Sequence, residues 1–229
     1  KHIKSDINTS HIPVILLTFN ARELAELQVE SSRNGLDGVF IWGGDFRILL
    51  AIVKLVEDRM NIDNDITTAG VQAIILVEDN VRFYSAYLPI IYEELMKQSQ
   101  SLIPDGINLS HKLLRMRARP KIILCTNFEE AEDMYKTYKD HILGIITDVE
   151  FPRYGQLDSN AGADFTRMVR AEKPDIPILL QSTRQEFDEI ARCCNVSFVL
   201  KHSRTLLNDV RNFMLDNFGL GDFVFRMPD

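Results

Sequence analysis

LGIITDVEFP, residues 143–152, is the stretch that indicates the fold. Its apolar and β-branched residues up to Thr147 are typical of a strand buried on both faces. Asp148 follows this strand directly, and Glu150 comes two residues later. A buried carboxylate is costly unless it is paired with a cation or bound to a metal. We therefore expect Asp148 to belong to a functional site at the end of a strand.

Further short apolar runs lie on both sides of this one, and amphipathic stretches separate them. Together they predict strands at residues 71–77, 121–125, 142–147, 176–181 and 196–200, and helices at residues 81–102, 128–138, 163–171, 185–193 and 204–217. Such an alternation predicts an α/β fold with a doubly wound, five-stranded parallel sheet in the order 2-1-3-4-5, like that of flavodoxins. In these folds ligands bind at the carboxyl ends of the strands.

Two segments are longer than this alternation requires. We expect the extended first helix to kink at Pro89, and a turn near residues 103–106 and a short helix with a basic face in residues 111–121 to follow it. The stretch EFPRYGQLDSNAG, residues 150–162, is rich in glycine and polar residues. We expect it to be a long loop, a type of segment that often carries functional residues.

Polar residues follow the predicted strands at the edge where ligands are expected. Glu78 and Asp79 come after the first strand, and Asp148 comes after the third. Ser182 follows the fourth strand, and Lys201 follows the fifth. Alone, each has an ordinary explanation: an aspartate after a strand often caps a helix, and a lysine there is usually solvated. Because the first, third and fourth strands are neighbours in the predicted sheet, we expect these side chains to meet.

The chemistry of such a group follows from its charge. Three carboxylates held close together repel one another, and a hard divalent cation such as Mg²⁺ relieves that repulsion with oxygen ligands. The cation would also neutralise an incoming phosphoryl group, so that the carboxylate of Asp148 can act as a nucleophile and form an acyl phosphate. The Lys201 ammonium and the Ser182 hydroxyl would contact phosphoryl oxygens.

Residues 71–217 resemble a receiver domain of bacterial two-component response regulators. The resemblance lies in four motifs: VEDN from residue 77, TDVEFP from residue 147, LLQS up to residue 182 and FVLK up to residue 201. It implies a phosphorelay signalling protein in which a histidine kinase or phosphotransfer protein phosphorylates Asp148. It implies Mg²⁺ as the cofactor, held by Glu78, Asp79, Asp148 and the backbone carbonyl of Glu150. It also implies that the chain is no enzyme beyond self-catalysed phosphotransfer to Asp148 and hydrolysis of the acyl phosphate.

The same resemblance assigns roles to residues around the acceptor. Phe198 occupies the place of a switch aromatic that turns inward when Ser182 moves toward the phosphoryl group. Glu150 and Arg184 would flank the path of the attacking water, and we expect them to pair across it and slow hydrolysis. The family usually has a proline after the lysine, in a cis peptide bond, where this chain has His202. Because a cis bond before any other residue costs about 2.5–4 kcal/mol, we expect a trans or strained bond, which affects the reach of the lysine.

Residues 1–60 repeat part of this pattern. Residues 12–20 resemble residues 176–184, and residues 47–61 have the helical spacing of residues 204–218. The segment therefore resembles the C-terminal half of a second, degenerate receiver, an incomplete α/β half-unit with two strands and two helices.

We expect residues 61–70 to form a polar linker and residues 218–229 to lead toward an attached output domain. The tandem arrangement resembles the N-terminal regions of large bacterial proteins in which receiver-like domains precede a PEP/pyruvate-binding phosphotransferase module. Because so small a unit as residues 1–60 buries little apolar surface, we expect it to be ordered only by docking on the receiver or on a second chain. A homodimer is the favoured arrangement, since two-fold dimers are the commonest oligomers.

The composition limits the classes of partner. The net charge is −7 and no basic stripe stands out, which argues against nucleic acid. No apolar run is long enough to span a membrane, and the 3 cysteines form no disulfide framework, which suits the cytoplasm.

Two alternatives keep a similar site but change the function. The first is a pseudo-receiver that docks partners without being phosphorylated, although the convergence of acidic residues argues against it. The second is a Mg²⁺-dependent phosphatase with an aspartyl nucleophile, in which Glu150 would serve as the acid and base. The position of Asp148 after the third of five strands, downstream of VEDN, favours the receiver.

Overall fold

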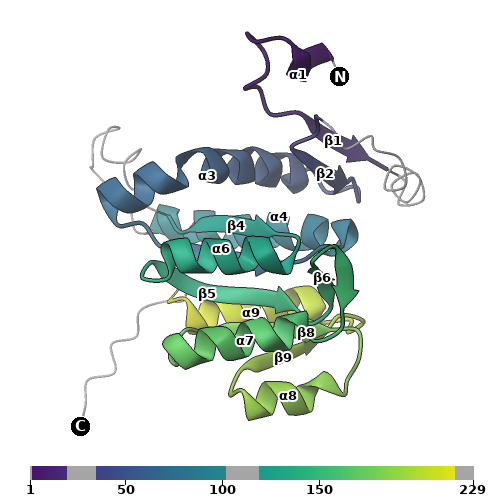
Figure 1. The fold of residues 1–229 in the computed structure, drawn as a ribbon, viewed down its shortest axis with the longest axis vertical. Coiled ribbons are helices and arrows are strands. Elements are labelled where there is room, and N and C mark those ends of the chain that lie inside the picture. The colour runs from purple at the N-terminus through teal and green to yellow at the C-terminus, as the bar shows by residue number, and fades with distance from the viewer. Residues whose placement is uncertain (1, 20–34, 102–118, 220–229) are drawn as a thin grey trace.

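The centre of the molecule is a five-stranded parallel sheet (Figure 1). The computed structural model describes residues 2–19, 35–101 and 119–219. The strands are β3 Ala73–Val77, β4 Lys121–Cys125, β5 Ile142–Asp148, β8 Ile178–Ser182 and β9 Ser197–Leu200. They lie in the order β4-β3-β5-β8-β9. Since β3 is the first of these five strands along the chain and β4 the second, the predicted order 2-1-3-4-5 is confirmed, and so is the α/β fold class.

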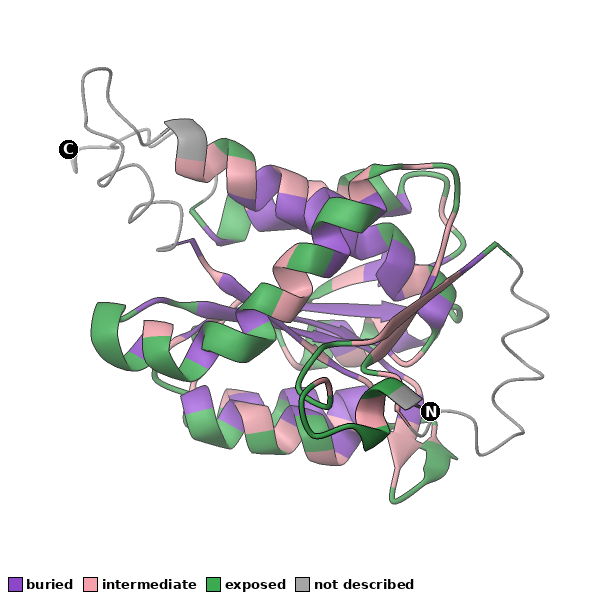
Figure 2. Ribbon diagram, turned by 90° about the horizontal axis from the view of Figure 1, so that it is seen from above, coloured by how far each residue is buried: buried purple, intermediate pink, exposed green. Residues whose placement is uncertain are grey.

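Helices cover both faces of the sheet, because successive residues of a strand point to opposite sides. Ile74 and Leu76 of β3 pack toward α4 and α9, whereas Ile75 and Val77 pack toward α6 and α7. The shorter α8 covers Leu180 of β8. The helices are α4 Val81–Ser101, α6 Phe128–Tyr138, α7 Ala161–Glu172, α8 Phe187–Cys193 and α9 Leu206–Asn217, and Figure 2 shows their buried residues gathered around the buried sheet.

The extended first helix is present, since α4 continues through Pro89. The turn expected near residues 103–106 and most of the basic stretch at residues 111–121 lie outside the described residues. The same holds for residues 220–229 of the expected C-terminal tail. These predictions stay predictions.

The predicted long loop at residues 150–162 contains a hairpin, so that prediction was wrong. The hairpin consists of the antiparallel strands β6 Phe151–Arg153 and β7 Gln156–Asp158. Tyr154 and Gly155 form its turn with φ values of 51° and 76°, the left-handed conformation that a two-residue hairpin turn requires. Phe151 is fully buried among the side chains of α6 and α7, and it anchors the hairpin to the core.

The predicted linker at residues 61–70 is helical up to residue 69, so that prediction was also wrong. These residues belong to α3 Arg47–Ala69, which ends at Gly70 in the left-handed conformation, with a φ of 62°. Ile62 and Ile66 extend the apolar face of this helix and are buried in the same core as α6. Most of the polar residues around them face the solvent, which is why the composition suggested a linker.

The N-terminal segment docks on α4, which is one of the two predicted arrangements. It consists of α1 His2–Ser5, the parallel strands β1 Ile15–Thr18 and β2 Gly38–Ile41, and α3, while its other predicted helix falls in residues 20–34, outside the described residues. Phe40 of β2 packs edge-on against the ring of Tyr84, with 5.5 Å between ring centroids. Ile48 and Ile52 of α3 join the same apolar core as α4. The segment is therefore ordered by contact with the unit of residues 71–217, which we name the receiver-like unit.

A buried carboxylate, Asp58 of α3, also joins the two parts. It accepts hydrogen bonds from the Arg119 guanidinium at 2.7 and 2.9 Å and from the Tyr92 hydroxyl at 2.8 Å. It accepts a further one, at 3.0 Å, from the backbone N–H of Ile122 on the outer edge of β4. An edge strand presents backbone groups without a strand partner, so α3 covers this edge and satisfies one of them.

We expect Asp58→Ala to destabilise the chain by about 3–5 kcal/mol, because it leaves the Arg119 guanidinium buried without its carboxylate. Equilibrium unfolding in urea, followed by circular dichroism, measures this loss. Glu57→Ala is the matched control: the exposed Glu57 side chain pairs with Lys54, and its removal should cost less than about 1 kcal/mol. If both substitutions cost the same, Asp58 does not hold the segment in place.

Candidate functional site

The predicted acidic residues meet at the carboxyl end of the sheet. Glu78 and Asp79 follow β3, and Asp148 ends the neighbouring β5. One carboxylate oxygen from each of the three lies within 4.8 Å of the others. Glu78 is fully buried, Asp148 nearly so, and Asp79 is partly open to solvent. In the described part of the chain, no other group of three potential metal ligands comes together in this way.

Lys201 follows β9, the edge strand of the sheet, and its side chain reaches this acidic group. Its ammonium lies 2.5 Å from an oxygen of Asp148 and 2.7 Å from an oxygen of Glu78. It also lies 4.3 Å from the centre of the Phe83 ring, at the start of α4. The described residues contain no cis peptide bond, so the bond to His202 is trans. His202 in place of a proline therefore does not prevent Lys201 from reaching Asp148.

Close packing fixes the backbone around Asp148. The backbone N–H of Val149 donates to the Asp148 carboxylate at 2.7 Å, and Gly162 donates its own N–H to the Val149 carbonyl at 2.9 Å. A Cβ atom at position 162 would lie 1.9 Å from the Asp148 carbonyl oxygen. The first turn of α7 can therefore approach β5 so closely only with glycine at this position.

Burial raises the pKa of all three carboxylates, and the like charge of Asp148 adds to the shift at Glu78 and Asp79. Burial raises the pKa of Glu78 to about 8, and the negative charge of Asp148 adds to the shift while Lys201 opposes it. Burial also raises the pKa of Asp79, again with a contribution from Asp148. It raises the pKa of Asp148 as well, although Lys201 and the Val149 N–H lower it. A divalent cation would relieve both causes, so this set of oxygen donors suits a hard metal ion.

Ser182 ends β8, the strand beside β5, and is fully buried. Its hydroxyl accepts the backbone N–H of Arg184 at 3.1 Å and so shapes the turn that leaves the strand. The structure thus places Ser182 at the predicted edge of the sheet. Its contact with a phosphoryl oxygen stays a prediction.

Glu150 and Arg184 form an ion pair, as expected, while its place across the path of attacking water stays a prediction. The Arg184 guanidinium lies 3.2 Å from a Glu150 carboxylate oxygen. The same guanidinium lies 3.3 Å from Glu186 and stacks 4.6 Å above the centre of the Phe187 ring. These contacts hold Arg184 over the turn between β8 and α8. That the backbone carbonyl of Glu150 binds a metal stays a prediction.

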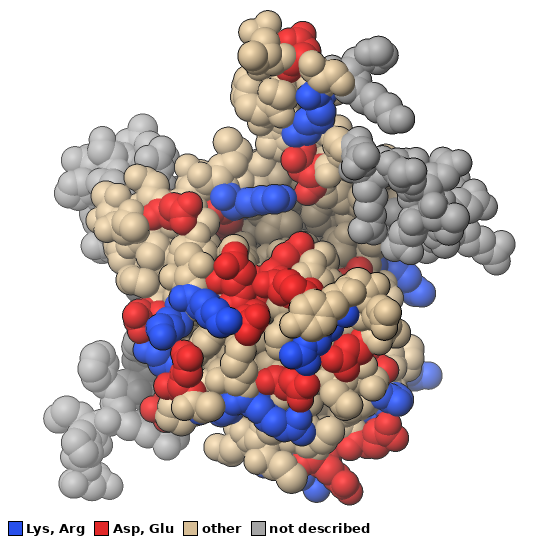
Figure 3. Space-filling view, viewed as in Figure 1, with Lys and Arg blue, Asp and Glu red and all other residues tan. Residues whose placement is uncertain are grey.

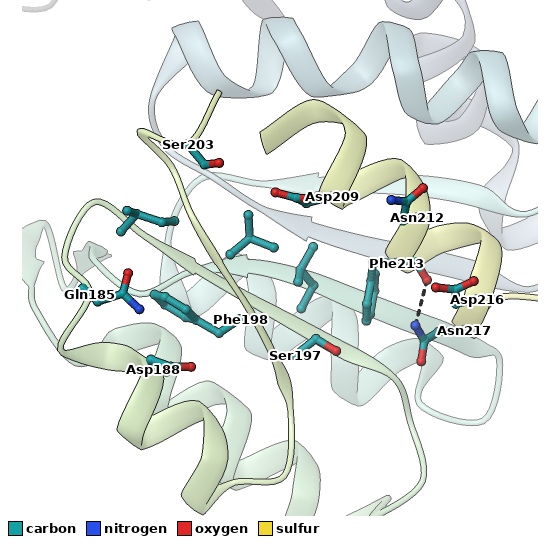
Figure 4. Close-up of a pocket in the computed structure, with 13 residues that line it drawn as sticks. Gln185, Asp188, Ser197, Phe198, Ser203, Asp209, Asn212, Phe213, Asp216 and Asn217 are labelled. Atoms are coloured by element: carbon teal, nitrogen blue, oxygen red, sulfur yellow. Dashed lines mark hydrogen bonds between the residues drawn. The ribbon is translucent and has the colours of Figure 1, made fainter. Parts of the chain in front are cut away.

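Phe198 of β9 is partly buried and packs against Leu180 and the residues of α8. Figure 4 shows it in a shallow groove between α8 and α9, which Gln185 and Asp188 also line. In this structure the ring therefore faces the groove, and its predicted movement with Ser182 stays a prediction.

Two further contacts at the site were not predicted from the sequence. Gln181 of β8 is fully buried and donates a hydrogen bond to Glu78 at 3.3 Å. Its position in the apolar run IPILLQ was the available signal, since a buried amide needs a partner. Phe83 was missed because it looks like an ordinary helix residue, and only its distance from Lys201 shows its place beside the site.

The surface shows no large area of a single sign on the face drawn in Figure 3, where acidic and basic side chains are interspersed. Within the described ranges, no helix is both long and apolar enough to cross a membrane.

No protein-family model and no curated protein matches the chain.

Solved structures with a similar arrangement of strands and helices do exist. One is a response regulator receiver domain protein from Clostridium thermocellum, with 12% identity, 65% of this chain and 95% of that chain covered, and a TM-score of 0.42. Another is the non-phosphorylated HemR receiver domain from Leptospira biflexa, with 16% identity, 69% and 98% covered, and a TM-score of 0.40. A third is the response regulator TrrA from Thermotoga maritima in complex with Mg²⁺-BeF, with 20% identity, 62% and 99% covered, and a TM-score of 0.35. These neighbours are receiver domains. The likeness is one of fold, over about two thirds of the chain.

The raised pKa values predict how Mg²⁺ binding depends on pH. Because Glu78, Asp79 and Asp148 keep protons at pH values where exposed carboxylates have lost them, a metal ion has to displace those protons. The affinity for Mg²⁺ should therefore fall as the pH is lowered from about 8 to about 6. Isothermal titration calorimetry at the two pH values measures the change.

Two variants control this experiment. Asp79→Ala removes a carboxylate of the acidic group and should weaken Mg²⁺ binding at least about tenfold. Ser182→Ala removes a hydroxyl that is engaged with the Arg184 backbone and should change the affinity less than about twofold. Equal affinities in the two variants would mean that the metal binds elsewhere.

Proposed function

We propose that the chain contains a phosphoacceptor receiver domain of a two-component phosphorelay, and that Asp148 accepts the phosphoryl group. The proposal rests mainly on the buried Lys201 ammonium, which lies between the carboxylates of Asp148 and Glu78 at the carboxyl end of the sheet. A carboxylate beside two others and a lysine is suited to accept a group that carries negative charge. The same proposal includes a histidine kinase or phosphotransfer protein as the donor, an attached or partner output that phosphorylation switches, and a cytoplasmic location.

The transfer is a substitution at phosphorus. A carboxylate oxygen of Asp148 attacks the phosphorus of the donor, and the bond from phosphorus to the donor's nitrogen or oxygen breaks with its electron pair. The leaving group keeps that electron pair, and Asp148 becomes an acyl phosphate. Mg²⁺, when bound by the carboxylates, would neutralise charge on the phosphoryl oxygens. Glu78 and Asp79 supply carboxylate oxygens on the β3 side, and the partly open Asp79 leaves a path from the solvent.

Lys201 has a second role in this proposal. In the present structure its ammonium is shared between Asp148 and Glu78. Phosphorylation replaces the charge on the Asp148 carboxylate with charge on the phosphoryl oxygens, so the ammonium would follow that charge. Ser182 would donate its hydroxyl proton to another phosphoryl oxygen, and its oxygen can accept the Arg184 N–H at the same time. A change at Asp148 would thereby reach the turns after β8 and β9.

An interaction module without phosphorylation is the second candidate. Its support is that Lys201 and Gln181 already satisfy Glu78 without any metal or phosphoryl group. In that case the polar group would serve to fix the ends of β3, β5 and β9. Phosphorylation separates the two candidates.

We expect incubation with acetyl phosphate and Mg²⁺ to add one phosphoryl group to the chain, with release of acetate. Intact-mass spectrometry measures the adduct. Asp148→Asn should abolish it, because an amide is a poor nucleophile toward phosphorus. Asp133→Asn on the exposed side of α6 is the matched control and should retain it. An adduct that survives in Asp148→Asn would refute the assignment of the acceptor.

The ion pair between Glu150 and Arg184 predicts a long-lived acyl phosphate, because two long side chains that are joined obstruct the approach of water. Glu150→Ala should speed the loss of the phosphoryl group by roughly tenfold, equivalent to about 1.4 kcal/mol of barrier. The loss of the mass adduct over time, after removal of acetyl phosphate, gives the rate.

Glu186→Ala is the control for this prediction. It removes the other carboxylate beside Arg184 and leaves the pair with Glu150 in place. Its rate should stay within about twofold of the wild-type rate. Equal acceleration by the two substitutions would show that the pair does not obstruct water.

A further inference from the structure

Helix α3 is apolar on two sides, and the receiver-like unit covers one of them. Ile48, Ala51 and Ile52 are buried in the core that includes α4. On another side of the helix, large apolar side chains remain between 44% and 76% exposed: Phe46, Leu49, Leu50, Val53 and Met60. Figure 2 shows exposed and buried residues following one another along this helix. Most exposed apolar side chains are scattered singly, whereas these form a continuous strip.

The strip has the spacing of a helix–helix contact. Phe46, Leu49, Val53, Val56 and Met60 follow one another at intervals of three and four residues alternately, and Val56 is partly buried. We name these five residues the outer seam. Alternating intervals of three and four keep apolar residues in line along a helix that packs lengthwise on another helix.

In the other copy of the internal repeat, part of the matching helix face is buried. When residues 47–61 are aligned with residues 204–218, Leu49 and Val53 correspond to Leu206 and Val210 of α9. Those two residues of α9 are 8% and 1% exposed, because they pack in the core on the sheet. Leu49 and Val53 of the outer seam therefore lie at positions that pack inward in the other copy of the pattern.

Strand β1 of the N-terminal segment has a strand partner on only one side among the described residues. Over the described residues, β1 pairs with β2 and with no other strand. The matching strand of the receiver-like unit, β8, has β9 on one side and β5 on the other. The N-terminal segment thus presents an apolar helix face together with a strand edge, and both are features that associate with a further chain.

We propose that a second copy of this chain covers the outer seam, with the two α3 helices antiparallel across a two-fold axis. A register that places Val53 opposite Val56 of the second copy brings Lys54 beside Glu57 of that copy, and Glu57 beside its Lys54. Within one chain, the Lys54 ammonium lies 2.7 Å from a carboxylate oxygen of Glu57 on the solvent side of α3. The flank of the seam is therefore complementary to itself under a two-fold rotation, which is what an isologous interface requires.

The size of the surface fits a dimer of moderate strength. The exposed parts of the seam and Leu50 amount to roughly 400–500 Å² per chain, within the range of the largest apolar patches on monomers. Two copies would bury roughly 800–1,000 Å² in total, the lower end of specific interfaces. Such a dimer is expected to dissociate at about micromolar concentration.

Sedimentation velocity of the full chain, from about 1 to about 100 µM, tests the proposal. We expect the wild type to shift from monomer to dimer over this range. Val53→Glu and Met60→Glu place a charge in the seam at exposed positions, so each should keep the fold, as judged by circular dichroism, and remain monomeric at every concentration. Two such positions are used so that a folding defect in one variant still leaves the other.

Leu207→Glu is the matched control. Leu207 is the counterpart of Leu50 in the internal repeat and is an exposed leucine of α9, 38% exposed, outside the seam. This variant should dimerise like the wild type. A wild type that stays monomeric up to about 100 µM, or seam variants that dimerise as well as Leu207→Glu does, would overturn the proposal.

Discussion

The site depends on the ion pairs that the Lys201 ammonium forms with Glu78 and Asp148. Lys201 follows β9, yet it contacts Glu78 after β3 and Asp148 at the end of β5. Strand β8 lies between β5 and β9 in the sheet. Without this cation, the like charges of two buried carboxylates would oppose folding unless protons or a metal took its place. The parallel sheet therefore does more than support the site, because its strand order brings together charges that are far apart along the chain.

Helix α4 connects this site with the N-terminal segment. Its first turn carries Phe83, whose ring lies 4.3 Å from the Lys201 ammonium. The adjacent Tyr84 donates its hydroxyl proton to the carbonyl of Val39 in β2 at 2.5 Å, and Ser85 accepts the N–H of Ile41 at 3.1 Å. Strand β2 thus contacts α4 residues that come soon after Glu78 and Asp79 in the chain. The first turn of α4 therefore contacts both the site, through Phe83, and the N-terminal segment, through Tyr84 and Ser85.

Ion pairs join helix α3 of the N-terminal segment to the receiver-like unit. Asp58 and Asp65 of α3 form ion pairs with Arg119 and Lys121, the two basic residues that lead into β4. Because Asp58 is fully buried, its removal would leave a buried cation without its partner. The same helix presents its outer seam to the solvent, so it serves the unit on one side and remains available for association on another. The N-terminal segment is therefore an integral part of the folded chain.

The sequence by itself determined the elements of the sheet, their order and the five polar residues at its edge. Periodicity and strand-end chemistry are local properties, and Glu78, Asp79, Asp148, Ser182 and Lys201 could be found from them. Tertiary structure decided what depends on contacts between distant residues. The helical state of residues 61–69 comes from the burial of Ile62 and Ile66, and the hairpin after Glu150 depends on the anchoring of Phe151 in the core. The partners of Asp58 lie between 34 and 64 residues away along the chain, and no local pattern records a contact over that distance.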